Sequence, residues 1–232
     1  ILSIPVFVMI FFIVRGIYRH TVGKKLKTTI TEDFKKEAER LEAEGRFVSA
    51  AAIHEKKFND LKKAAFLYER GGDLKKAAEI YNVLSMNKKA KELFLKDNNA
   101  EGAAQISMIE GEFEEAAGIY ERAGKKREAG AALERAGRRL ASAKAYREAG
   151  DYGNAARLLE EEGMLNEAAE MYGLSLRDKK LDGAGIHDFY SYALMLEKAG
   201  EKERALEVLR NIDSIDSLYK DVRERIHNLG IA

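Results

Sequence analysis

The sequence predicts an all-α protein, a right-handed α-solenoid of antiparallel helical hairpins preceded by a single N-terminal transmembrane helix. Three observations predict this fold. Pro5 is the only proline among 232 residues, so no later residue is kept out of a helix by a proline ring. Ala, Leu, Glu and Lys, which are strong helix formers, are abundant. Glycines recur at every thirteenth position of the central part, and no charged residue occurs from Ile1 to Val14.

Composition excludes several classes of function. The formal net charge of +1 gives the chain no overall attraction for nucleic acid, and we expect no nucleic-acid partner. The absence of Cys excludes disulfides, thiol nucleophiles and thiolate metal sites. No phosphate-binding glycine motif occurs, and the four histidines lack the spacing of metal ligands. We therefore expect no catalytic residue, no cofactor and no metal site, and the chain is not expected to be an enzyme.

Residues 1–19 are predicted to form a transmembrane anchor. A helix from Ile1 to Val14 reaches about 21 Å, and one that continues to Tyr18 about 27 Å, against a hydrocarbon core of about 30 Å. Three alternatives remain open: a residual secretory signal, a buried helix of the folded domain and a processed, pilin-like N-terminus. Secretory signals carry their positive charge before the apolar stretch, and surface helices are apolar on one side alone. The anchor residues are Ile4, Phe7, Phe11, Phe12, Arg15 and Arg19.

A basic segment follows the anchor. Five basic residues precede the first acidic residue, Glu32, and they are Arg15, Arg19, Lys24, Lys25 and Lys27. The positive-inside rule places this flank, and the C-terminal domain behind it, in the cytoplasm. The same charges predict contact with membrane lipid at the N-terminus. Residues 20–30 are then a basic juxtamembrane linker, and Thr29 and Glu32 have the spacing of a capping box at the start of a helical-repeat domain over 31–232.

The repeat is recognised by its turn residues, which stand at every thirteenth position. They are Gly111, Gly124, Gly137, Gly150 and Gly163, and the same register runs backward through Asn98, Ser85, Gly72, Asn59 and Arg46. This interval accommodates a helix of about ten residues and a tight turn, in which Gly or Asn adopts the left-handed conformation.

Small residues confirm this register. The residue five positions after each turn residue is small throughout, and the next residue is small in most repeats. Such a pair lets neighbouring helices approach closely, and helices this short need stacking to fold. The first members of the pairs are Ala51, Ala64, Ala77, Ala90, Ala103, Ala116, Ala129, Ser142, Ala155 and Ala168.

An aromatic series has twice this period. Its members, one in every second repeat, are Tyr68, Phe94, Tyr120, Tyr146 and Tyr172, which indicates a structural unit of two different helices. Their spacing from the small pairs favours a place in the interhelical core. The alternative is that some tyrosine hydroxyls line a binding groove.

The period breaks after Tyr172. Residues 177–185 are polar and glycine-rich and are predicted to form an irregular loop; the register resumes at Gly200. A C-terminal capping helix is predicted over 214–229, with Ser214 as its N-cap. Because a break in a regular repeat is suited to specialised contact, the candidate partner contacts are Tyr172, Arg177, Lys179, Lys180, His187 and Asp188. The alternative is that the loop only changes the angle of the C-terminal hairpin.

The segments GEFEEAAGIYERAG (111–124) and GDYGNAARLLEEEG (150–163) resemble tetratricopeptide-like repeats. The closest form is the short hairpin of soluble NSF attachment proteins and of clathrin- or coatomer-type solenoids, and the resemblance covers residues 45–173 and 186–210. The chain departs from true tetratricopeptide repeats, whose unit has about 34 residues with a Trp and a terminal Pro. The resemblance implies protein–protein interaction rather than catalysis.

The sequence therefore favours a membrane-anchored scaffold or adaptor that binds protein partners at the cytoplasmic face of a membrane. An accessory subunit of a multi-span membrane enzyme or transport complex is the alternative. Self-association into a homo-oligomer is compatible with both.

Overall fold

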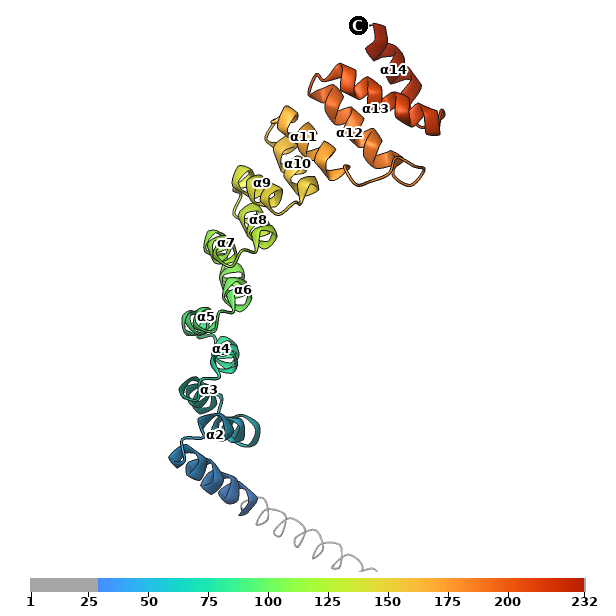
Figure 1. The fold of residues 1–232 in the computed structure, drawn as a ribbon. Coiled ribbons are helices and arrows are strands. Elements are labelled where there is room, and N and C mark those ends of the chain that lie inside the picture. The colour runs from blue at the N-terminus through green and yellow to red at the C-terminus, as the bar shows by residue number, and fades with distance from the viewer. Residues whose placement is uncertain (1–28, 232) are drawn as a thin grey trace, which may run out of the picture. The chain divides into compact units, whose positions relative to one another are not determined.

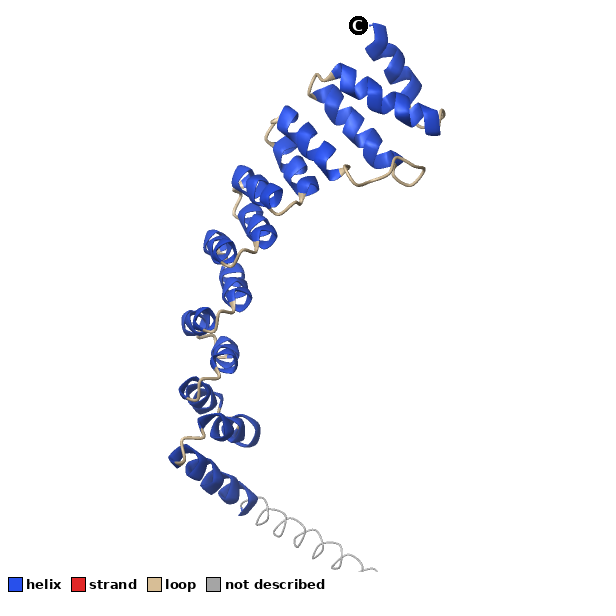
Figure 2. Cartoon of the chain, viewed as in Figure 1, coloured by secondary structure: helices blue, strands red, loops and turns tan. Residues whose placement is uncertain are grey.

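The computed structural model describes residues 29–231, and every regular element among them is a helix (Figure 2). A helical segment over residues 29–43 comes first. The elements that follow are α2 (Phe47–Ile53), the π-helix η1 (His54–Phe58), α3 (Leu61–Arg70), α4 (Leu74–Val83), α5 (Asn87–Lys96), α6 (Ala100–Glu110), α7 (Phe113–Arg122), α8 (Lys126–Arg135), α9 (Arg139–Glu148), α10 (Tyr152–Glu161), α11 (Leu165–Ser175), α12 (Ile186–Lys198), α13 (Lys202–Ile215) and α14 (Val222–Ile231).

The described residues form two compact units, the first ending at Ala103 and the second beginning at Ala104. Within each unit, successive helices pack against each other, from α2 to α5 and from α7 to α14, and up to α11 they are joined by tight turns (Figure 1). In the first unit α3 packs against both α2 and α4, and in the second unit the contacts run in order from α7 to α14. The predicted all-α array of helical hairpins is confirmed for the described residues, and its right-handed winding stays a prediction.

Each regular repeat is a ten-residue helix followed by a three-residue turn. The end of α9 shows the geometry: Gly150 has φ +75°, its N–H bonds the carbonyl of Arg147 at 3.1 Å, and the next N–H, of Asp151, bonds the carbonyl of Tyr146 at 2.8 Å. These two bonds form the Schellman motif, which closes a helix on a left-handed residue. Asp151 also begins α10, since its carboxylate accepts the Asn154 N–H at 3.4 Å. One residue thus ends one helix and caps the next.

One predicted turn residue is wrong. Arg46 has φ −87° and is the N-cap of α2, whereas its neighbour Gly45 carries the left-handed conformation with φ +74°. The non-glycine turn residues Asn59, Ser85 and Asn98 do adopt positive φ, as predicted. The interval from Gly45 to Asn59 is therefore one residue longer than the regular intervals that follow it.

The π-helix η1 accommodates this additional residue. A π-helical turn is a one-residue insertion into an α-helix, and η1 continues directly from α2 over His54–Phe58. Counted from Gly45, the first small pair is Ala50 and Ala51, and both are fully buried. The predicted partner Ala52 is partly exposed, because a register drawn from Arg46 lies one residue too late.

The small pairs form the interhelical core. All the Ala residues predicted as first members of the pairs are buried with 0% exposure, and Ser142 and the Gly130 position are buried as well. A Cβ added at Gly130 would lie 3.1 Å from the Tyr146 ring, closer than most side-chain contacts allow. Neighbouring helices thus approach closely where the sequence is small, and larger residues such as Leu67, Leu93 and Leu158 fill the space between them.

The C-terminal part differs from prediction in one boundary. The break after α11 is a loop as predicted, and the Asp182 carboxylate accepts the N–H groups of Ala184 and Gly185 within it. The capping helix, however, begins at Val222 and not at Ser214. Ser214 lies in the last turn of α13, with its hydroxyl on the Asn211 carbonyl at 2.7 Å. The buried stripe of α13 extends to Ile212, and the helix itself continues to Ile215, beyond the expected start of the next.

The predicted membrane anchor, with Ile4, Phe7, Phe11, Phe12, Arg15 and Arg19, lies outside the described residues. Within residues 29–231, no helix combines the length and the apolar character needed to cross a bilayer. Residues 29 and 30, assigned to the linker by the sequence, already belong to the first described helix.

Candidate partner-binding groove

A repeated polar cluster links three successive helices. The carboxylate of Glu134, near the end of α8, accepts hydrogen bonds from the Tyr146 hydroxyl of α9 at 3.4 Å and from the Arg157 guanidinium of α10 at 2.6 Å. Burial and the neighbouring Glu134 carboxylate raise the pKa of Tyr146, and the hydrogen bond to Glu134 raises the pKa of Arg157. The tyrosine therefore stays a neutral donor and the arginine a cation.

The same arrangement recurs in both units. Glu69 of α3 accepts from the Tyr81 hydroxyl at 3.3 Å and from Lys89 at 2.7 Å. In the second unit Glu160 of α10 accepts from the Tyr172 hydroxyl at 3.5 Å and from Lys198 at 2.8 Å. These hydroxyls face glutamates of the preceding helix, so the tyrosines are core residues whose polar ends are occupied within the array.

His54 takes the place of tyrosine in the first cluster. Its Nε2 lies 3.3 Å from Glu42, and Lys63 pairs with the same carboxylate at 2.8 Å. Burial acts to raise the pKa of Glu42, but the bonds from Lys63 and His54 outweigh it and hold the pKa below its ordinary value. The sequence separation from glutamate to lysine is one residue longer here than from Glu69 to Lys89, because η1 adds one residue.

A second row of contacts crosses the second unit. The second residue of one helix pairs with the N-cap residue of the helix two further on, so the two partners lie almost two repeats apart in the chain. Glu114 of α7 pairs in this way with Arg138 at 2.7 Å, and Arg127 of α8 pairs with Asp151 at 2.8 Å. These ion pairs join the N-terminal ends of alternate helices.

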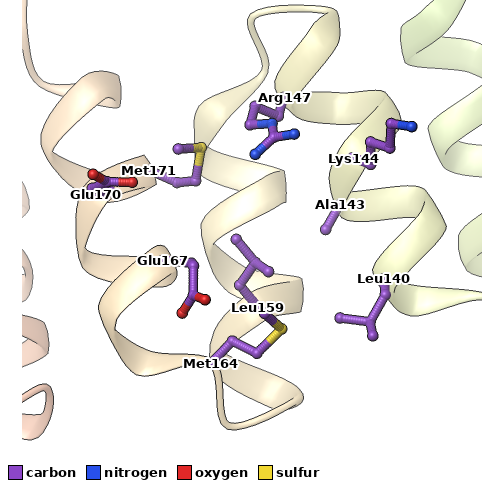
Figure 3. Close-up of a pocket in the computed structure, with 9 residues that line it drawn as sticks. All are labelled: Leu140, Ala143, Lys144, Arg147, Leu159, Met164, Glu167, Glu170 and Met171. Carbon is purple, nitrogen blue, oxygen red and sulfur yellow. The ribbon is translucent and has the colours of Figure 1, made fainter.

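Both rows are interrupted between α9 and α11. The pair equivalent to Glu114 and Arg138 is Leu140 and Met164, which cannot form an ion pair. The three positions of the Glu134 cluster are taken by Arg147, Leu159 and Glu170, so its tyrosine hydroxyl is missing here, as it also is at the equivalent Leu133 of α8. A cavity of about 340 Å³ lies at this place (Figure 3).

Figure 3 shows how the cavity is lined. Lys144 and Arg147 come from α9, Glu167 and Glu170 come from α11, and apolar side chains of Leu140, Ala143, Leu159, Met164 and Met171 line the space between them. We call this feature the α9–α11 groove. The four charged side chains are exposed, and none of them has an ion-pair or hydrogen-bond partner among residues 29–231. Leu140 is 52% exposed.

The six residues that the sequence predicts to bind a partner have different neighbours in the structure. Lys179 and Asp188 pair with each other at 2.6 Å. His187 lies 3.3 Å from the Tyr219 hydroxyl and 3.4 Å from the Lys220 ammonium group. Tyr172 is bonded to Glu160, as described above. Arg177 and Lys180 are exposed on the loop. A common contact surface for these six residues stays a prediction.

The lining of the groove combines exposed charged groups with apolar side chains. It has no histidine and no hydroxyl group. Within residues 29–231, no three His, Asp or Glu side chains are grouped so as to hold a metal ion. The sequence contained one usable signal for the groove, the regular pairing of alternate helices that is lost at Leu140 and Met164.

No protein-family model and no curated protein matches the chain. Solved structures do match. YrrB, described as a TPR protein with an unusual peptide-binding site, is 19% identical; the match covers 87% of this chain and 100% of that chain, with a TM-score of 0.30. The TPR2AB domain of yeast Sti1, in a complex with pHSP90, is 15% identical over 88% and 99%, with a TM-score of 0.33. BtubC from P. vanneervenii is 16% identical over 90% and 85%, with a TM-score of 0.28.

The descriptions of the first two matches name tetratricopeptide repeats. The finer likeness to soluble NSF attachment proteins and coat-protein solenoids is not among these matches and stays a prediction.

Proposed function

We propose that this chain is a non-enzymatic scaffold that binds a protein partner through the α9–α11 groove. The observation that carries the proposal is the interruption of two contact rows at one place, where Leu140 and Met164 replace an ion pair and unpaired charges flank the cavity. A concave, partly apolar site with a few convergent charged groups is the usual form of a binding pocket. The helical repeat supplies the rigid support.

Membrane attachment through residues 1–19 is the second part of the proposal. Its support is the uncharged stretch from Ile1 to Val14 and the five basic residues that follow it. The helical-repeat domain then lies in the cytoplasm, with its groove available to partners at the membrane surface. An accessory subunit of a multi-span complex uses the same anchor and groove, and the identity of the captured partner separates the two functions.

The groove is tested by closing it. Leu140→Glu together with Met164→Arg installs between α9 and α11 the pair that joins α7 to α9. We expect the tagged full chain to lose its partner from solubilised membranes when it carries this change, while its helix content stays that of the wild type. The matched control is Glu114→Leu with Arg138→Met, which removes the bridge elsewhere and should leave partner recovery intact. Equal recovery with the closed groove would contradict the proposal.

The topology is tested by thiol labelling. The chain has no Cys, and Ser214 is exposed, so Ser214→Cys provides a single reactive position. In intact cells this thiol should resist a membrane-impermeant reagent and react after permeabilisation. Labelling without permeabilisation would place the helical-repeat domain on the other side of the membrane.

A further inference from the structure

We propose that the occupant of the α9–α11 groove is an amphipathic helix of the partner, with acidic residues along one flank of its apolar stripe and basic residues along the other. This inference rests on the proposed function, since it specifies the partner of the same groove. Its support is the distribution of charge and apolar surface around the cavity.

The two walls have opposite charge and the same spacing. Lys144 and Arg147 are three residues apart on α9, and Glu167 and Glu170 are three residues apart on α11. Three residues are just under one helical turn, so each wall presents two like charges about 4.5 Å apart along its axis. A second helix presents its own flanking charges with that spacing. Carboxylates of the occupant then face α9, and its cations face α11.

The apolar lining of the groove favours an occupant with an apolar stripe between its acidic and basic flanks. Leu140, Leu159 and Met164 lie between the charged walls (Figure 3). The cavity of about 340 Å³ has room for anchoring side chains and not for a whole helix, so the body of the occupant lies above it. Methionine side chains are flexible and polarizable, and they adapt to anchors of different shape.

The three surfaces of the groove favour a helix over an extended segment. Successive side chains of an extended strand point in two opposite directions, whereas those of a helix are distributed around its axis. A helix can therefore place one acidic, one apolar and one basic stripe against three surfaces at once, in the manner of helix-in-groove recognition.

The walls do not neutralise each other directly. In the equivalent contact between α8 and α10, the Arg157 guanidinium donates a hydrogen bond to the Glu134 carboxylate at 2.6 Å. The Tyr146 hydroxyl donates to the same carboxylate and holds it in place. Between α9 and α11 the signs are reversed, and Leu159 takes the place of that tyrosine. Arg147 and Glu170 have no hydrogen-bond or ion-pair partner among the described residues, so both side chains can pair with a ligand.

The test uses three synthetic helical peptides of about four turns, with leucines at i, i+3, i+4 and i+7. One has glutamates on one flank and lysines on the other, the second has glutamates on both flanks, and the third has lysines on both. Binding to the full chain is measured at low ionic strength. The wild type should prefer the mixed peptide by about threefold to tenfold, the effect expected of two exposed ion pairs.

Charge reversal should reorder the peptides. Lys144→Glu with Arg147→Glu makes both walls acidic, and the all-lysine peptide should then bind best. Glu167→Lys with Glu170→Lys makes both walls basic, and the all-glutamate peptide should bind best. The control matched to the first of these variants, Lys202→Glu with Arg210→Glu, changes the net charge by the same amount on exposed residues of α13 and should keep the wild-type order.

An unchanged order in both reversed variants would overturn the inference, even if the native partner still depends on the open groove. Tighter binding of a mixed peptide whose helix is broken by proline would also overturn it, in favour of an extended ligand. Dimerisation of the chain that is lost on closing the groove would identify a second copy as the occupant and would overturn it as well. Loss of the native partner on groove closure tests the proposed function separately.

Discussion

Arg157 of α10 reaches past α9 to the carboxylate of Glu134 on α8, at 2.6 Å. This contact joins helices that are two apart in the chain, and the Tyr146 hydroxyl of the intervening helix bonds the same carboxylate. The cluster therefore fixes the spacing of three helices with one acidic side chain. Its recurrence at Glu69 and Glu160 makes it a structural element of the repeat.

A double-mutant cycle measures this contact. Glu134→Gln and Arg157→Met should each destabilise the chain, and their effects should couple by about 0.5–1 kcal/mol, because both side chains are partly exposed. Chemical denaturation followed by circular dichroism gives the free energies of unfolding. Additive effects of the two changes would mean that the bridge does not contribute to stability.

Alkaline pH should weaken the tyrosine contacts. Burial and adjacent glutamates raise the pKa of Tyr146 and Tyr172, so their contribution is complete below about pH 10 and is lost as the pH rises through the raised values. Tyr146→Phe with Tyr172→Phe should lower stability at neutral pH by about 1–2 kcal/mol for two lost hydrogen bonds. The stability curves of variant and wild type should converge above about pH 10. A constant difference over that range would count against the role of the hydroxyls.

The π-helix should tolerate the loss of one residue. Deleting the exposed Lys56 from η1 restores the regular interval and leaves His54 and Glu55 in register. The melting temperature should stay within a few degrees of the wild type. Deleting Arg122 from α7 shortens a regular interval by one residue and should destabilise the chain by about 1–3 kcal/mol. Equal losses from the two deletions would show that η1 is not an insertion.

Overpacking tests the register of the small pairs. Ala156 on α10 is fully buried, whereas Ala141 on α9 is exposed. Ala156→Leu should destabilise the chain by about 1–3 kcal/mol, because it forces neighbouring helices apart. Ala141→Leu adds the same atoms at the surface and should change the free energy of unfolding by less than about 0.5 kcal/mol. If thermal denaturation gave equal shifts, the assignment of buried faces would be incorrect.

The regular features of the fold are local, and they could be predicted from the sequence. A left-handed turn residue restricts the sequence to Gly, Asn or another tolerant residue, so the series from Asn59 to Gly163 is visible without coordinates. A fixed period, however, cannot represent an insertion. Counting back 13 residues from Asn59 ignores the residue that η1 adds. The predicted first turn residue is therefore Arg46, one residue after the observed Gly45.

The groove could not be predicted in the same way, because it is defined by missing contacts. Leu140 and Met164 are ordinary apolar residues in their own helices. They become informative only when Glu114 and Arg138 are known to meet at the equivalent positions of the preceding helices. The loop after α11 was predicted to contact a partner because it breaks the period of the sequence. Its Lys179, however, forms an ion pair with Asp188.

Site-specific photo-crosslinking in intact membranes tests the central claim most directly. A photoreactive amino acid is placed at Leu140 and at Met164, two apolar residues that line the groove, and at Leu218, which is 85% exposed in the turn between α13 and α14. We expect the two groove positions to give adducts with the same partner protein and Leu218 to give none. Adducts from Leu218 alone, or the same adducts from all three positions, would contradict a partner docked in the α9–α11 groove.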